Sequence, residues 1–253
     1  MEPSDSIVPH LVPVPNSNYC KMKNVGAAAS KGEILIFLDS DVIPEPDWLG
    51  ALLCAFADPA VSVVVGNTYV DCHHAGTYAK SMALSWMFPL RDPSDRLTLT
   101  TCFYANNAAF RRDAFLSRQF PHVPGLTHAP ARLLWERLLS EGVSVWHAGN
   151  VRASHPPPNG PIHFLRRAIA SGRARAFSEP LPNLGAMIGW IRADIDLILW
   201  NSKKTVLSGD KVGLRWWQMP FTIAIGAAYC TLENWGSLLS LIFPGMMRDR
   251  FQL

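Results

Sequence analysis

Two aspartates that stand two residues apart carry the clearest chemical signal in this sequence. Asp39 and Asp41 flank Ser40 directly after a run of apolar residues. Two carboxylates this close repel each other unless a cation or a proton lies between them, and a divalent metal ion would satisfy both while also gripping a diphosphate. The alternative is that Asp41 caps the following helix and Asp39 is a solvated loop residue, and the spacing by itself favours neither.

The elements around the aspartate pair place it at the end of a strand. Residues 33–38 consist of Glu33 and a continuous apolar run with β-branched and aromatic members, which is typical of a strand buried on both faces of a parallel sheet. Helical patterns are predicted before it, at 24–30, and after it, at 48–56. Because open α/β sheets bind ligands at the carboxyl ends of their strands, this position suits a metal site.

Strand and helix patterns continue to alternate until a proline-rich breaker at 156–160. The further predicted elements are strands at 61–66 and 143–146, a strand that runs into a loop over 97–111, and helices at 78–88 and 129–140. This alternation predicts the α/β class for residues 1–160.

The residues around the aspartate pair resemble the signature of family 2 glycosyltransferases. Three linked motifs carry the resemblance, and they read Lys23-Asn24-Val25-Gly26, Lys31-Gly32-Glu33 and Asp39-Ser40-Asp41. The resemblance implies a GT-A-like, Rossmann-like domain with a mostly parallel sheet flanked by helices. It also implies that Asp39 and Asp41 hold Mg²⁺ or Mn²⁺ and the donor diphosphate, and that Lys23, Asn24 and Gly26 bind the donor.

Two later segments fit the same resemblance. Residues 104–112 are similar to the segment that lies beneath the sugar and acceptor, so Asn106 and Asn107 are predicted to offer amide hydrogen bonds to hydroxyl groups. A turn formed by this asparagine pair is the alternative. Residues 151–155 are similar to a short strand that ends in histidine, which implies that His155 reaches the metal; an isolated histidine is more often structural.

The acidic pair that usually supplies the catalytic base in this family is missing. Alignment on Arg137 and Gly142 puts Pro130-Ala131 at its position. The nearest candidates for the base are His128, which precedes the predicted helix as the acidic pair would, and Glu136. A base must reach the proton that it removes, so a surface role for both residues is the alternative.

The sequence departs from the family pattern in two other respects, which bear on the expected activity and on processive synthesis. Family members open with a strand, a helix and a second strand, whereas only 23 residues precede Asn24 here. If the sequence is complete, we expect weak donor binding and doubtful activity. Val212 stands where the processive synthases carry glutamine before Arg215-Trp216, which disfavours processive synthesis.

The residues after 160 have a different character. Residues 161–185 comprise a basic amphipathic helix and a linker, and residues 186–253 form an apolar tail rich in tryptophan. The basic residues of the helix are Arg166, Arg167, Arg173 and Arg175, which either meet lipid headgroups or the phosphate of a lipid-linked acceptor, or form a solvated face. The tail is predicted to associate with a membrane as an imperfect span, a re-entrant hairpin or interfacial helices.

Composition limits the possible partners. A net charge of +3 over 253 residues gives no reason to expect nucleic acid as a partner. The sequence therefore predicts an inverting, non-processive glycosyltransferase that uses a nucleoside-diphosphate sugar and a sugar or lipid-linked acceptor, in envelope polysaccharide or glycolipid synthesis. We expect membrane association through residues 161–253 with the catalytic domain on the cytoplasmic side. The alternatives are a catalytically inactive, membrane-associated scaffold or binding protein with the same fold, and a nucleotidyl-transfer enzyme.

Overall fold

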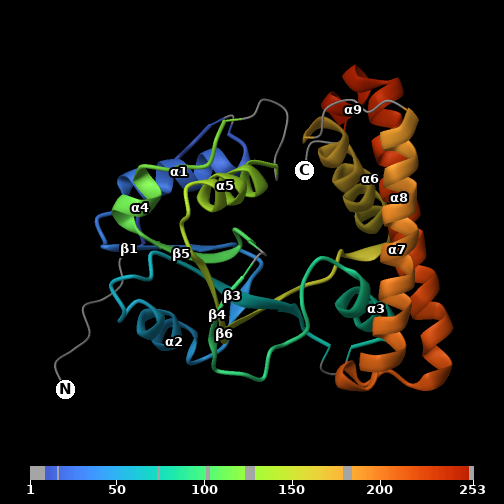
Figure 1. Ribbon diagram of the computed structural model, residues 1–253, viewed down its shortest axis with the longest axis horizontal. Helices are drawn as coiled ribbons and strands as arrows, with labels where there is room; N and C mark the ends of the chain where they lie inside the picture. The colour runs from blue at the N-terminus through green and yellow to red at the C-terminus, as the bar shows by residue number, and fades with distance from the viewer. Residues whose placement is uncertain are drawn as a thin grey trace.

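A computed structural model describes residues 9–15, 17–72, 75–100, 103–122, 129–178 and 184–250. Within these ranges a six-stranded sheet carries helices on both faces, and a group of long helices packs beside one end of it (Figure 1). The predicted α/β class is confirmed.

The sheet is mixed and mainly antiparallel. Its strands, in chain order, are β1 (Ile34–Leu38), β2 (Ile43–Pro44), β3 (Val63–Val70), β4 (Leu97–Leu99), β5 (Asn107–Arg111) and β6 (Val145–His155). Their order is β1-β5-β3-β6-β2, and β4 also pairs with β6. Of the pairs in the described chain, only β3 and β6 run parallel. β5 lies between β1 and β3 and runs opposite to both. The prediction of a mostly parallel sheet is therefore wrong.

The strand before the aspartate pair lies at an edge of the sheet. Among the described strands β1 pairs only with β5, from Ile34 opposite Arg111 to Leu38 opposite Asn107. Its apolar run reflects helices on both faces: Leu35 and Phe37 are buried on one side, and Ile34 and Ile36 pack on the other. The apolar pattern correctly predicted that both faces of β1 are buried. The parallel neighbours that it also suggested are absent from the described strand pairs.

The helices divide into two groups. In chain order they are α1 (Tyr19–Ala29), α2 (Trp48–Ala55), α3 (Thr77–Ser85), α4 (Arg112–Leu116), α5 (Ala129–Ser140), α6 (Gly160–Ser178), α7 (Leu184–Ser208), α8 (Met219–Ile242) and α9 (Pro244–Arg250), with 3₁₀ turns η1 (Asp210–Val212) and η2 (Trp216–Gln218) before α8. Helices α1, α4 and α5 cover one face of the sheet and α2 covers the other, whereas α3 and α6–α9 form what we call the helical unit (Figure 1).

The first helix begins earlier than its sequence pattern predicts. Asn18 caps it, because its side-chain oxygen accepts a 2.9 Å hydrogen bond from the backbone N–H of Lys21. The helix therefore contains Tyr19 and Lys23, which lie one turn apart and face the same way. This early start places both side chains beside the end of β1.

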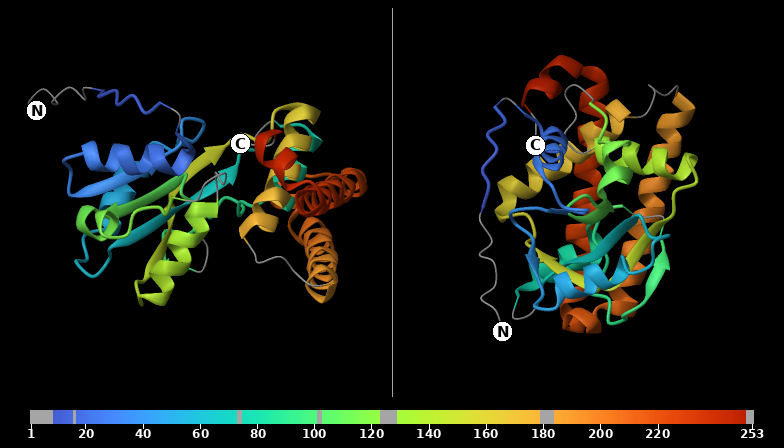
Figure 2. Two further views of the ribbon diagram at one scale, coloured as in Figure 1. Left: turned by 90° about the horizontal axis from the view of Figure 1, so that it is seen from above. Right: turned by 90° about the vertical axis from the view of Figure 1, so that its left-hand side faces the viewer.

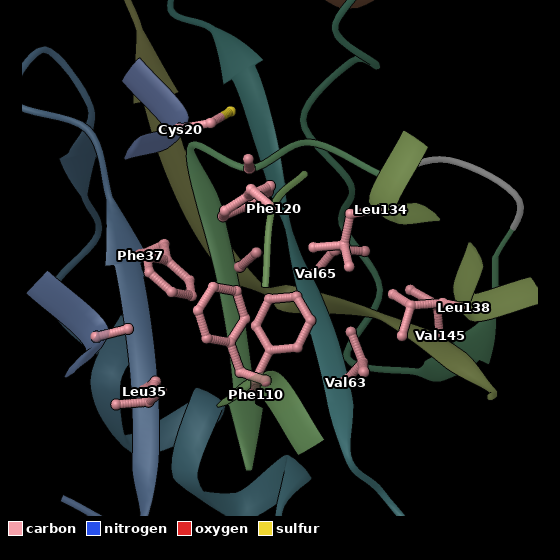
Figure 3. Packing of buried hydrophobic residues seen from close by; sticks show 14 residues of the cluster. Cys20, Leu35, Phe37, Val63, Val65, Phe110, Phe120, Leu134, Leu138 and Val145 are labelled. Carbon is pink, nitrogen blue, oxygen red and sulfur yellow. The ribbon is translucent and has the colours of Figure 1, made fainter. Parts of the chain in front are cut away.

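An aromatic core fixes β1 and β5 beneath the first group of helices. Phe37 contacts Phe110 and Phe115 at ring-centroid distances of 5.8 and 4.7 Å, and Phe120 closes the cluster at 5.9 Å from Phe37 (Figure 3). Aromatic side chains bury a large apolar area each, and tilted and edge-to-face contacts add to that stabilisation. The core holds the strand end that carries Asp39.

The helical unit is joined to the sheet by a third apolar cluster. Helix α8 runs beside α6 and α3 (Figures 1 and 2), and Met82, Ala168 and Tyr229 from these three helices are buried together. The chain after 160 thus packs on α3, a helix from before the proline-rich breaker. The structure holds, in its described part, no helix with both the length and the apolarity needed to cross a bilayer.

Candidate functional site

A cavity of about 530 Å³ lies between the sheet and the helical unit. The end of β1 contributes Asp39, the segment before β5 contributes Asn106, and the end of β6 contributes His155. Helix α5 contributes Ala131 and Arg132, and the opposite wall consists of α6 and α8. Asp39, Asn106 and His155, which were predicted for the donor, acceptor and metal sites, therefore line one cavity, which we call the main cavity.

Asp39 is held from two directions. Its backbone N–H donates to the carbonyl of Asn106 at 3.2 Å, which ties the end of β1 to the start of β5. Its carboxylate accepts hydrogen bonds from the hydroxyl of Tyr19 at 2.9 and 3.0 Å and forms a 2.6 Å ion pair with Lys23. Since Lys23 is only 10% exposed, the charge of Asp39 is compensated within the protein.

The groups of α1 beside Asp39 stay protonated. Burial, together with the charge of Asp39, raises the pKa of Tyr19, which remains a hydrogen-bond donor. Burial also raises the pKa of the Cys20 thiol to about 12, so this buried cysteine is not a thiolate nucleophile at neutral pH. Helix α1 thus serves to position and neutralise the carboxylate.

Asp41 faces a different partner. Its Oδ2 lies 3.4 Å from Nε2 of His155. The pairing of β2 with β6 brings the two together, because Ile43 lies opposite Ser154 in the sheet. The other ring nitrogen of His155, Nδ1, lies 2.6 Å from the carbonyl oxygen of Pro156, and since a carbonyl only accepts, Nδ1 carries a proton. Nε2 is then the nitrogen available to a ligand, as in many metal-bound histidines.

The residues present fit a divalent cation in part. Asp39 and Asp41 have separate partners, so the predicted sharing of one ion by both carboxylates does not match their placement. In the described residues no group of three or more His, Cys, Asp or Glu side chains is suited to a metal. Asp41 and His155 together offer two ligands, and Mg²⁺ or Mn²⁺ commonly takes the remainder from phosphate oxygens and water. The imidazole nitrogen favours Mn²⁺ over Mg²⁺.

Asn106 and Asn107 have different surroundings and therefore different roles. Asn106 is nearly buried, accepts a 3.3 Å hydrogen bond from Thr68 through Oδ1, and lines the main cavity. Asn107 is only 1% exposed; its Oδ1 accepts from the indole N–H of Trp48 at 3.0 Å and its amide donates to the carbonyl of Val151 at 3.2 Å. Its polar atoms are engaged in the core, so the predicted contact of Asn107 with an acceptor does not fit its position.

Among the other predicted donor-binding residues, only Lys23 contacts the site. Asn24 donates from its amide to the carbonyl of Phe120 at 2.9 Å and accepts from the N–H of the same residue at 3.1 Å. This pair of bonds fastens the segment after α4 to α1, so Asn24 has a structural role here. Gly26 lies in the same helix, with nothing within 4 Å of the position that a Cβ would take.

Of the two proposed bases, only Glu136 lies within the described residues, and it is not found in the main cavity. His128 lies outside the described residues. Glu136 is exposed on α5 and pairs with Arg132 at 3.3 Å, and it does not line the cavity. Its predicted catalytic role therefore lacks support from its position.

The wall formed by α6 and α8 combines arginines that the sequence analysis named as candidates for an acceptor phosphate with Glu233, which it missed. It contributes Arg167, Arg175 and Glu233 to the main cavity. A second cavity of about 610 Å³, the adjoining cavity, shares Phe88, Tyr104 and Glu233 with it. The sequence feature that could have indicated Glu233 is that it interrupts the apolar run of α8.

The four arginines of α6 do not form one surface. Arg166 is exposed, whereas Arg173 is only 2% exposed. Arg175 pairs with Asp194 at 3.0 Å and donates to Asn234 at 2.8 Å, both within the helical unit. A common headgroup-facing surface of all four, as the sequence allowed, is therefore incorrect.

Comparison with known proteins identifies the segment that contains Asp39, Asp41 and Asn106. No curated protein matches the chain. A protein-family model described as glycosyl transferase family 2 matches residues 10–117. Over these residues the chain is similar to glycosyl transferase family 2.

Proposed function

We propose that the protein transfers a sugar from a nucleoside-diphosphate donor to an acceptor hydroxyl within the main cavity. The observation that carries the proposal is that Asp39, Asn106 and His155 meet in this cavity, two of them from the segment that matches the family. Residues from the helical unit close the other side, so the cavity is shaped by both parts of the chain.

The donor end of the cavity is the end of β1. Asp41 and His155 would hold Mg²⁺ or Mn²⁺, and such an ion, when bound, offsets the negative charge of the departing diphosphate. Lys23 keeps Asp39 paired and oriented. Arg132 and Arg167 add positive charge to the lining, which favours an anionic ligand.

The acceptor end lies toward the helical unit. The adjoining cavity has a mainly apolar lining that includes Trp86, Leu197 and Trp200, which suits an acyl or alkyl chain. We therefore favour a lipid-linked acceptor. Transfer with inversion, one sugar at a time, in envelope polysaccharide or glycolipid synthesis, remains part of the proposal.

The helical unit also offers a surface for a membrane. The turn between α7 and α8 and the first turn of α8 expose apolar side chains, with Trp216 80% and Phe221 63% accessible, beside the exposed cations Lys211 and Arg215. Apolar and cationic side chains together favour the interface of an anionic bilayer. We propose peripheral attachment there, with the catalytic cavity on the cytoplasmic side.

Donor turnover tests the enzyme assignment. Release of nucleoside diphosphate is measured from UDP-glucose, UDP-N-acetylglucosamine and GDP-mannose with Mn²⁺, for the native chain and for Asp41→Asn. We expect a loss of about 100-fold in kcat/KM, which equals about 2.7 kcal/mol of transition-state stabilisation. Equal rates, or none from the native chain, would favour the alternative of an inactive binding protein.

A further inference from the structure

We propose that Glu233 of α8 is the general base that takes the proton from the acceptor hydroxyl. The inference rests on the proposed sugar transfer and assigns a residue to a step that α5 leaves without one. Two observations carry it: the cavity wall formed by α5, and the position of Glu233.

The wall formed by α5 offers no carboxylate to the acceptor. Ala131 lines the main cavity at the position where the family resemblance places the acidic pair. The acid of this helix, Glu136, is exposed and pairs with Arg132. Of the described residues that line the main cavity, Asp39 and Glu233 are the two that carry carboxylates, and Asp39 is engaged by Lys23 and Tyr19.

Glu233 lies on the opposite wall, with its carboxylate available. It lines both the main and the adjoining cavity, so an acceptor that extends from one into the other passes it. Throughout the described residues, no hydrogen bond or ion pair engages its side chain. The neighbouring cation, Arg175, is directed to Asp194 and Asn234 instead.

A close helix crossing fixes the position of Glu233. A Cβ on Gly172 of α6 would lie 1.8 Å from the carbonyl oxygen of Glu233, and a Cβ on Gly236 of α8 would lie 2.2 Å from the carbonyl oxygen of Ile169. The hydroxyl of Ser237 donates to the carbonyl of Gly172 at 2.9 Å across the same contact. The backbone of Glu233 is therefore held rigidly against α6, as positioning of a base requires.

The surroundings of Glu233 suit proton transfer near neutral pH. Burial raises its pKa to about 7; Arg175 of α6 acts in the opposite direction and Asp194 of α7 in the same direction. Other titratable groups that line the two cavities include Arg167 on α6, Lys204 on α7 and His147 on β6. Tyr229 and Cys230 on α8 also line the adjoining cavity, and burial raises the pKa values of both. A base whose pKa lies near the working pH is both available and strong enough to act.

The step balances without a further reactant. The acceptor O–H bond breaks and its proton moves to Glu233, while the acceptor oxygen forms a bond to the anomeric carbon. The bond from that carbon to the diphosphate oxygen breaks, and the electron pair leaves with the diphosphate. Glu233 then returns the proton to water.

The test compares native protein, Glu233→Gln and Glu233→Asp in turnover of UDP-glucose, UDP-N-acetylglucosamine and GDP-mannose, with octyl glucoside or water as acceptor. We expect Glu233→Gln to lower kcat by about 10²- to 10⁴-fold. The acidic limb of the native pH profile, near pH 7, should disappear, and Glu233→Asp should restore part of the rate. Calorimetric binding of the nucleoside diphosphate should be the same in all three proteins.

Each outcome decides a separate question. Native turnover that Glu233→Gln leaves unchanged, or that keeps its acidic limb, would overturn the role of Glu233 and leave the proposed function standing. Absence of turnover in the native chain would overturn both. A variant that loses activity together with nucleotide binding would show a structural role for Glu233, which also overturns the inference.

Discussion

The imidazole of His155 at the end of β6 lies 3.4 Å from the carboxylate of Asp41, which follows β1. These two strands are separated in the sheet by β5 and β3, and the pairing of β2 with β6 brings the chain after β1 across to His155. The contact joins the chain after β1 to the end of β6, and its histidine lines the main cavity. The donor site of our proposal depends on this pair.

Lys23 stabilises the site through its ion pair with Asp39. We expect Lys23→Met to lower the free energy of unfolding at pH 7 by about 1–3 kcal/mol, because a largely buried carboxylate loses a charged partner. Urea denaturation measures the change. Lys21→Met is the matched control, since Lys21 is exposed on the same helix and should change stability by less than about 0.5 kcal/mol. Equal effects of the two variants would contradict the importance of the pair.

The crossing of α6 and α8 requires glycine. Gly172→Ala places a methyl group 1.8 Å from a backbone oxygen of α8, so we expect a loss of about 3 kcal/mol in unfolding free energy. Gly189→Ala in α7, where nothing lies within 4 Å, should instead stabilise by about 0.5–1 kcal/mol. Both are measured by chemical denaturation. Similar changes in the two variants would mean that the helices do not pack this closely.

The raised pKa of Glu233 predicts a pH dependence of stability. Its pKa is about 7 in the folded protein against an ordinary value of 4.5, so between these values the folded form binds a proton that the unfolded form has released. The native protein should therefore lose stability relative to Glu233→Gln as pH rises from 4.5 to 7, with a constant difference above that. Urea denaturation at pH 5, 6, 7 and 8 gives the comparison. A difference that does not vary with pH would mean that the carboxylate is not desolvated.

Attachment to an anionic bilayer should depend on the turn between α7 and α8. We expect Trp216→Glu to weaken binding to phosphatidylcholine–phosphatidylglycerol vesicles by about tenfold or more, because the bilayer loses a large apolar contact and meets a like charge. Co-sedimentation measures the binding. Leu99→Glu, which alters an exposed apolar residue of β4, is the control and should bind as the native chain does.

The sequence patterns predicted the positions of helices and strands along the chain better than their arrangement in space. The helix at 129–140 and the strand at 33–38 were predicted close to their observed bounds, because apolar periodicity reports which faces are covered. Apolar periodicity does not report whether a neighbouring strand runs parallel or antiparallel. We therefore expected β1 among parallel strands, whereas it lies beside the antiparallel β5. Whether a sheet is parallel or antiparallel depends on pairing between segments distant in the sequence, and the local apolar pattern does not encode this pairing.

The residues of the candidate site could likewise be predicted only in part from the sequence. The family resemblance singled out Asp39, Asn106 and His155, which the structure brings to one cavity. It also singled out Asn107, whose amide is engaged in the core by Trp48 and Val151. Side chains of adjacent residues at the start of a strand point to different sides, so composition cannot tell which of the two asparagines meets a ligand. Glu233 was visible only as an acid in an apolar helix, because its place depends on packing between α6 and α8.

Metal-dependent nucleotide binding tests the central claim most directly. UDP, GDP and dTDP are titrated by calorimetry into native protein, Asp41→Asn, His155→Ala and Asp47→Asn, with and without Mn²⁺. Asp47 is an exposed acid before α2 that makes no capping hydrogen bond, so its variant is the matched control. We predict that Mn²⁺ tightens the binding of at least one nucleotide by about tenfold or more in the native and Asp47→Asn proteins, and that Asp41→Asn and His155→Ala lose this effect. Nucleotide binding that ignores Mn²⁺, or that survives Asp41→Asn unchanged, would contradict the account.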